Sequence, residues 1–166
     1  MKTVSDLFSR RRATVIALLI GAALLLPHTL VFGQAKDSLL GNWVLDRGKS
    51  TFDPDTTLQN RSVEFAAKDG GVSFLQKTVQ GNGNTVQIDF VAKYDSKDVP
   101  ISGSQLDTVS LKRVNANTVE RTGKVKGVVA ETATMVVSGN GKILTITTKG
   151  SLDGVDYSST QVYEKQ

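Results

Sequence analysis

Cysteine is absent from the 166-residue chain, and histidine occurs only once, at His28. From residue 36 onward the chain therefore has neither residue type. This excludes disulfides, ordinary zinc sites and the Ser-His and Cys-His pairs of nucleophilic catalysis in that region. Catalysis by histidine as acid or base is excluded for the same reason. We therefore predict no enzymatic activity, no metal site and no cofactor.

Paired carboxylates are the remaining route to acid–base catalysis without histidine. Aspartate is favoured in turns, because its side chain hydrogen-bonds the nearby backbone. We interpret the aspartate pairs of this chain as turn residues and predict no catalytic residue among them. Three such pairs lie in or beside expected turns: Asp53 with Asp55, Asp95 with Asp98, and Asp153 with Asp156.

A strong excess of charge of one sign is also missing once the first 35 residues are set aside. That segment holds Lys2 and three arginines at positions 10–12 against a single acid, Asp6. The other 131 residues hold 16 basic and 15 acidic side chains, a net charge of +1. Binding to nucleic acid relies on a marked basic patch. We therefore expect no nucleic-acid partner.

The single long hydrophobic run is Ala13–Leu26, a 14-residue segment that contains no charged side chain. A helix that spans a bilayer needs about 20 apolar residues, so this run is short for a membrane span. It follows the three arginines at positions 10–12, an arrangement typical of a secretory signal peptide. We therefore predict an exported protein, periplasmic or extracellular.

Small residues at Gly33 and Ala35 predict where the signal peptide is cleaved. We place the cleavage after Ala35, with cleavage after Gly33 and an uncleaved N-terminal anchor as the alternatives. The chain then consists of a signal peptide at residues 1–35 and one domain at residues 36–166. After cleavage no segment remains that we expect to span a membrane.

Alternation of apolar and polar residues is the main pattern after residue 36. In Thr85–Tyr94, apolar residues occupy every second position from Val86 to Tyr94. A period of two indicates a half-buried β-strand. Eight further runs are similar: Asn42–Asp46, Ser62–Ala67, Val72–Gln80, Thr108–Val114, Thr118–Val125, Val128–Val137, Lys142–Lys149 and Ser158–Lys165.

Glycine and asparagine separate these runs, as at residues 81–84 and 139–141. Both residues adopt the positive φ angles that tight hairpins require. Nine strands with short connections predict an up-and-down antiparallel sheet, and closure into a barrel removes its exposed edges. We predict an all-β fold with a single up-and-down antiparallel barrel of about 8–10 strands. The alternative is a two-sheet β-sandwich, and the one long irregular connection is expected at residues 49–59.

Short motifs at both ends of this domain resemble those of the calycins, the superfamily of lipocalins and intracellular fatty-acid-binding proteins. Gly41 and Trp43 form a Gly-x-Trp motif on the first predicted strand, and the last one ends in x-Tyr-Glu-Lys at residues 162–165. The chain is also similar to small exported lipocalin-like proteins of bacteria. The resemblance implies structural roles for Gly41 and Trp43, with the tryptophan closing one end of the barrel.

Two positions depart from the fatty-acid-binding proteins. Their helical lid between the first two strands is replaced here by a loop at Asp53-Pro54-Asp55. Their Arg-x-Tyr motif on the last strand reads Gln161-Val162-Tyr163, and their second arginine falls near Val136. The resemblance therefore implies a small apolar ligand but leaves out the arginines of the carboxylate clamp.

Strand pairing predicts which residues line the interior. A two-residue hairpin loop at Lys126-Gly127 pairs Val125 with Val128 and, counted back, Arg121 with Thr132. The opposite face then carries apolar residues that suit solvent poorly, and a shift of one residue would exchange the two faces. The predicted ligand-binding residues are Arg121, Thr132, Thr134, Thr145, Thr147, Gln161 and Tyr163. The apolar residues that this assignment leaves on the solvent-facing side are Met135, Val137, Leu144 and Ile146.

Arg121 is the one charged residue on the predicted inner face. A buried guanidinium needs an acceptor. That acceptor is either an anionic or carbonyl group of a ligand, or an internal aspartate or glutamate; alternatively, the side chain reaches the rim.

We predict an exported, non-enzymatic barrel that binds a small, mostly apolar ligand, a lipid or an apolar metabolite. The alternative is a protein-recognition or inhibitor module whose barrel is filled by side chains; the sequence does not indicate a particular protein partner. A cavity on the order of 300 Å³ or more favours the first function. A large exposed apolar patch at one end favours the second.

Overall fold

The computed structural model describes residues 37–166, and every regular element in this range is a β-strand. The signal peptide expected at residues 1–35 lies outside the described residues and stays a prediction. The strands are β1 (Gly41–Asp53), β2 (Leu58–Lys68), β3 (Gly71–Gln80), β4 (Thr85–Ala92), β5 (Val99–Pro100), β6 (Thr108–Asn115), β7 (Thr118–Val125), β8 (Val128–Val137), β9 (Ile143–Leu152) and β10 (Val155–Lys165).

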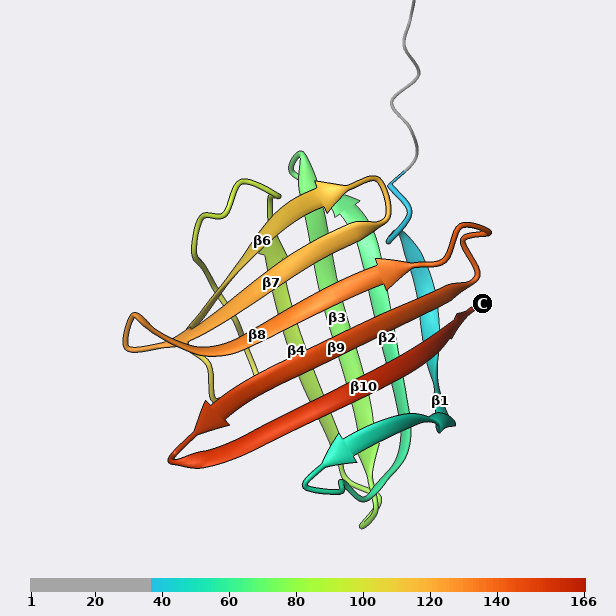
Figure 1. Cartoon of the computed structure of the whole chain (residues 1–166), viewed down its shortest axis with the longest axis vertical. Helices are drawn as coiled ribbons and strands as arrows, with labels where there is room; N and C mark the ends of the chain where they lie inside the picture. The colour runs from blue at the N-terminus through green and yellow to red at the C-terminus, as the bar shows by residue number, and fades with distance from the viewer. Residues whose placement is uncertain (1–36) are drawn as a thin grey trace, which may run out of the picture. The chain divides into compact units, whose positions relative to one another are not determined.

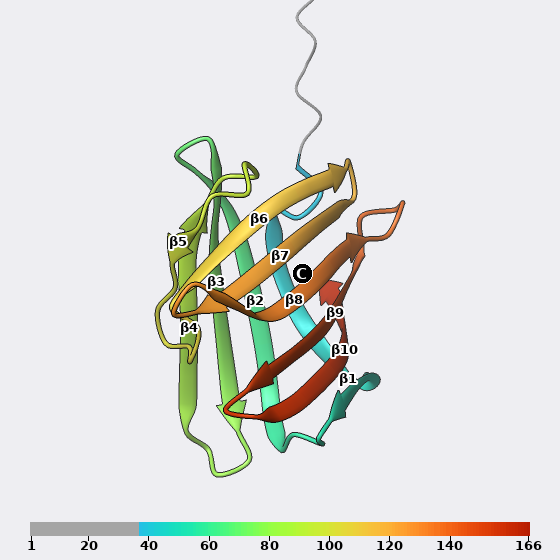
Figure 2. The ribbon, with the colours of Figure 1, turned by 60° about the vertical axis from the view of Figure 1, so that its left-hand side comes forward.

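All ten strands belong to one antiparallel sheet with the order β4-β3-β2-β1-β10-β9-β8-β7-β6-β5. Nearly every strand pairs with its neighbour in the chain, and the first strand pairs with the last. Figures 1 and 2 show β2–β4 facing β6–β10, with the strands of the two layers crossing. The predicted all-β up-and-down barrel is confirmed as one continuous, nearly closed sheet, in place of the alternative with two sheets.

The first strand is longer than predicted. It continues to Asp53 and β2 begins at Leu58, so most of the loop expected at residues 49–59 is strand. Its pairing with β10 shifts between Asp46 and Thr51. At this bulge the Ser50 hydroxyl donates to the Asp46 carbonyl (2.7 Å). The bend lets the start of β1 pair with β2 while its end continues along β10 (Figure 1).

The barrel closes between β4 and the short β5, a strand that the sequence did not predict. Asp89 and Ser102 exchange backbone hydrogen bonds of 3.2 and 2.9 Å across this gap. The next residue, Gly103, has φ +71°, and a Cβ atom there would lie 1.9 Å from the Gln87 carbonyl oxygen. The lack of a side chain therefore allows the connection to lie directly on β4.

Trp43 is fully buried in the core. Its indole N–H donates to the Leu39 carbonyl (2.8 Å), and Lys165 Nζ lies 4.7 Å from its ring centroid. Gly41 has φ +134°, and a Cβ atom there would lie 2.6 Å from Lys165 Cε. Gly41 thus leaves the space through which Lys165 reaches the tryptophan ring, which gives the Gly-x-Trp motif a packing role.

Residues 37–40 cross the end of the barrel next to this tryptophan. Asp37 accepts hydrogen bonds from the Tyr94 hydroxyl and from Arg113 Nη2, the second at 2.6 Å. Ser38 donates to the Ala116 carbonyl (2.9 Å) in the turn between β6 and β7. These contacts tie the start of the described chain to the β6–β7 hairpin. Within residues 37–166 there is no helix of the length and hydropathy needed to cross a membrane.

Candidate functional site

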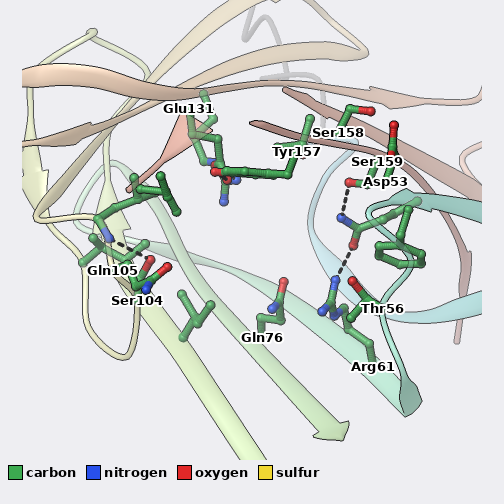
Figure 3. Close-up of a pocket in the computed structure, with 18 of the residues that line it drawn as sticks. Asp53, Thr56, Arg61, Gln76, Ser104, Gln105, Glu131, Tyr157, Ser158 and Ser159 are labelled. Carbon is green, nitrogen blue, oxygen red and sulfur yellow. Dashed lines mark hydrogen bonds and ion pairs between the residues drawn. The ribbon is translucent and has the colours of Figure 1, made fainter. Parts of the chain in front are cut away.

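A cavity of about 370 Å³ lies inside the barrel, between the two layers of strands. Exposed residues at its rim come from the β1–β2 connection and from the segment before β6, Pro54 and Gln105 among them. Figure 3 shows polar side chains reaching into the cavity from both layers. Its apolar walls are Phe52, Phe74, Ile88, Ile101, Leu106 and Leu152.

One group of polar side chains in this cavity, the Arg121 cluster, consists of Arg121 on β7, Glu131 on β8 and Tyr157 on β10. Arg121 Nη2 forms an ion pair with Glu131 Oε1, and these side chains are 15% and 11% exposed. The Tyr157 hydroxyl donates to Glu131 Oε2 (2.8 Å). Burial and the neighbouring Glu131 charge raise the pKa of Tyr157 above its usual range. The positive charge of Arg121 is therefore already compensated by an internal carboxylate.

A second group, the Arg61 cluster, consists of Arg61 on β2, Thr78 on β3, and Gln161 and Tyr163 on β10. Arg61 Nε donates to Thr78 Oγ1 (2.9 Å), and its Nη1 donates to Gln161 Oε1 (2.8 Å). The Tyr163 hydroxyl donates to the same Gln161 oxygen (2.6 Å). Burial raises the pKa of Tyr163 to about 12, even though the charge of Arg61 lowers it. Both protein acceptors of Arg61 are neutral.

The predicted ligand-binding residues divide into two sets. Arg121 and Gln161 line the cavity, and Tyr163 is fully buried beside Gln161. The four threonines do not line it. Thr132, Thr134 and Thr147 are exposed on the outer face, and Thr145 is half-buried on that face, so their predicted inward orientation is wrong.

A β-bulge explains this error. Val125 pairs with Val128 as predicted, but Lys124 pairs with Val129 and Gly123 with Glu131, which leaves Ala130 without a partner. From the bulge onward the two strands are offset by one residue, so Arg121 lies opposite Ala133 and not Thr132. The inward-facing residues beyond the bulge are Ala133, Met135, Val137, Leu144 and Ile146, all of them buried.

Three cavity-lining members of the two clusters are absent from the predicted ligand-binding residues: Arg61, Glu131 and Tyr157. Arg61 shares the parity of the buried Val63 and Phe65 on its strand, so alternation could have identified it. The inward position of Glu131 depends on the bulge. Tyr157 lies one residue before the predicted start of the last strand at Ser158, whereas β10 begins at Val155.

Residues 37–166 contain no group of three or more histidine, cysteine, aspartate or glutamate side chains placed to hold a metal ion.

Comparison with known proteins identifies the fold of the chain but no family. No family model matches the chain, and no curated protein matches it. Among solved structures it is similar to As-p18, an extracellular fatty acid binding protein, at 16% identity and a TM-score of 0.50, over 78% of this chain and 97% of that one. It is also similar to zebrafish ileal bile acid-binding protein complexed with cholic acid, at 13% identity and a TM-score of 0.47, over 78% and 99% of the two chains. The likeness to As-p18 shows a calycin-like fold.

Proposed function

We propose that this chain is a non-enzymatic binding protein that holds a small, mostly apolar ligand inside its barrel. The cavity of about 370 Å³ carries this proposal. Ligand pockets in proteins have volumes of about 300–1,000 Å³ and combine apolar walls with a few polar groups. The apolar walls together with the Arg61 and Arg121 clusters fit that description.

The alternative function, protein recognition by a filled barrel, has less support. The cavity exceeds the volume of about 300 Å³ that separates the two functions. The large exposed apolar residues of the described chain are valines, and they are distributed over β4, β6, β8 and β10. Singly exposed apolar residues are common on soluble proteins and do not by themselves define a docking surface.

The cavity volume also limits the size of the ligand. A volume of about 370 Å³ corresponds to about twelve water molecules at the density of the liquid. A ligand that fits inside has on the order of a dozen non-hydrogen atoms, the size of decanol. A longer chain would extend through the rim.

A cavity-filling substitution tests this function. Ile88 on β4 lines the cavity, so Ile88→Trp should occupy its volume; Val91, on the opposite face of the same strand, provides the matched control Val91→Trp. We expect decanol to raise the Tm of the wild-type protein and of Val91→Trp, but not that of Ile88→Trp. An equal rise in all three proteins would place the ligand elsewhere. No rise for decanol or any member of a panel of apolar metabolites would contradict the function.

We also propose that the protein is exported, with its signal peptide removed after Ala35. The pattern of residues 1–35 supports this. Asp37, two residues beyond the proposed cleavage point, is held by Tyr94 and Arg113, so cleavage there keeps these contacts. We expect the intact mass of the protein from the extracytoplasmic fraction to match residues 36–166. A full-length mass in the membrane fraction would instead indicate an uncleaved anchor.

A further inference from the structure

The two arginines that line the cavity differ in their charge balance. Arg121 forms an ion pair with Glu131, and the second oxygen of that carboxylate accepts a hydrogen bond from Tyr157. Both Glu131 oxygens are therefore occupied, and the Arg121 cluster carries no net charge. A second anion placed there would be repelled by Glu131.

Arg61 has no such partner. Among residues 37–166 no carboxylate lies within 4 Å of its guanidinium. Its two protein acceptors, Thr78 and Gln161, are neutral, and the Gln161 oxygen is already shared with the Tyr163 hydroxyl. A guanidinium has more N–H donors than these two bonds use. Arg61 therefore contributes both an uncompensated charge and free donors to the cavity.

Neighbouring groups favour an anion next to Arg61. Gln76 extends from β3 toward the cavity, and its amide donates to the Thr78 oxygen that also accepts from Arg61 (3.4 Å) (Figure 3). The amide thus adds a further N–H donor close to the guanidinium. The other charged residue of the lining outside the two clusters is Asp53, which is exposed to solvent at the rim.

A half-buried cation without a counterion is unfavourable, and an anionic ligand removes that cost. One uncompensated positive charge matches one negative charge. We propose that Arg61 anchors the head group of a monoanionic amphiphile, whose apolar chain lies against Ile88, Leu106 and Leu152. This inference rests on the proposed function of the cavity. It also transfers the anion-binding role that the sequence suggested for Arg121 to a residue on a different strand.

Calorimetric titration with three ligands of equal chain length tests this assignment in the wild-type protein. Decanoate carries one negative charge, decanol carries none and decyltrimethylammonium carries one positive charge. Hydrogen bonds to charged groups correspond to a change in affinity of about 10- to 100-fold. We expect decanoate to bind about 10- to 100-fold more tightly than decanol, and decyltrimethylammonium to bind most weakly.

Variants then identify the arginine responsible. We expect Arg61→Met to bind decanoate no more tightly than decanol, and measurable binding of decanol by this variant shows that the cavity is intact. Arg61→Lys, which keeps the charge but not the forked donor geometry, should retain part of the preference. The matched control is the double variant Arg121→Met/Glu131→Gln, which removes both members of the other pair and should leave the preference unchanged.

The possible failures are distinguishable. If wild type binds decanol as tightly as decanoate, or if Arg61→Met or Arg61→Lys fully retains the preference, the inference about Arg61 is overturned while the binding function stands. Loss of the preference in the double variant alone would assign the anion to Arg121. If none of the three ligands binds, the inference and the proposed function fail together.

Discussion

The Arg121–Glu131 pair is the most buried ion pair within residues 37–166, with side chains only 15% and 11% exposed. Removing one member of a buried pair leaves the other charge uncompensated, at a cost of about 3–5 kcal/mol. We expect Glu131→Gln to lower the free energy of unfolding by about 3 kcal/mol, measured by urea denaturation. Arg121→Met/Glu131→Gln should lose less, because it removes both charges. A double variant less stable than the single one would contradict this account.

Residue by residue, the sequence predicted the cavity only in part. Arg121 and Gln161 were assigned to the interior, and both line the cavity. The partner of Arg121 could not be identified, because Glu131 reaches the interior only through the bulge at Ala130. Ala130 is neither glycine nor proline, so nothing in the sequence marks the irregularity. Arg61 alternates in step with the buried Val63 and Phe65, so the pattern that identified the strands also predicts that Arg61 faces inward.

At the scale of elements, Gly103 controls the closure of the barrel between β4 and β5. A Cβ atom at Gly103 would lie 1.9 Å from the Gln87 carbonyl oxygen, whereas one at Gly141, with nearly the same φ (+70° against +71°), would have no neighbour within 4 Å. Gly141→Ala should therefore show only the backbone cost of a positive φ, about 1–2 kcal/mol.

We expect Gly103→Ala to destabilise the protein by more than Gly141→Ala, and to speed hydrogen exchange at the amides of Asp89 and Ser102. These amides form the backbone hydrogen bonds across the closure. Urea denaturation and amide exchange, measured on both variants, check the two parts of this prediction. Equal losses of stability with unchanged exchange would show that the close approach at Gly103 does not hold the edge.

The strands themselves were predictable because alternation and glycine–asparagine turns are local signals. The runs at residues 85–94 and 128–137 correspond closely to β4 and β8. The end of β1 was missed because residues 49–53 do not alternate, and pairing with β10 is what makes that segment a strand. Such pairing depends on residues more than a hundred positions away, which no local pattern contains.

At the scale of the whole molecule, the three tyrosines make the free energy of unfolding fall at alkaline pH. Burial raises the pKa values of Tyr94, Tyr157 and Tyr163, the last of them from 10.0 to about 12. Below pH 10 these phenols are protonated in both the native and the unfolded state. Above pH 10 the phenols of the unfolded chain lose their protons first, because their pKa values are lower than those of the native state. The free energy of unfolding therefore falls as the pH rises through the native pKa values.

We therefore expect the urea midpoint to fall between pH 10 and pH 12, the window set by the pKa of Tyr163. Tyr163→Phe should show a shallower fall, because phenylalanine cannot ionise. Its stability at neutral pH should be lower by about 1 kcal/mol, the contribution of the lost hydrogen bond to Gln161. Phenolate absorbance that develops fully near pH 10 in the native protein would contradict the prediction.

The central claim is that the barrel holds a small molecule, and native mass spectrometry tests it most directly. The protein should be isolated from the cells that naturally produce it, without added ligand, and weighed before and after organic extraction. The cavity volume predicts an adduct on the order of 200 Da, from about twelve water volumes. It also predicts that Ile88→Trp carries no adduct. A bare mass for the wild-type protein, together with no uptake from a panel of apolar and anionic amphiphiles, would contradict the claim.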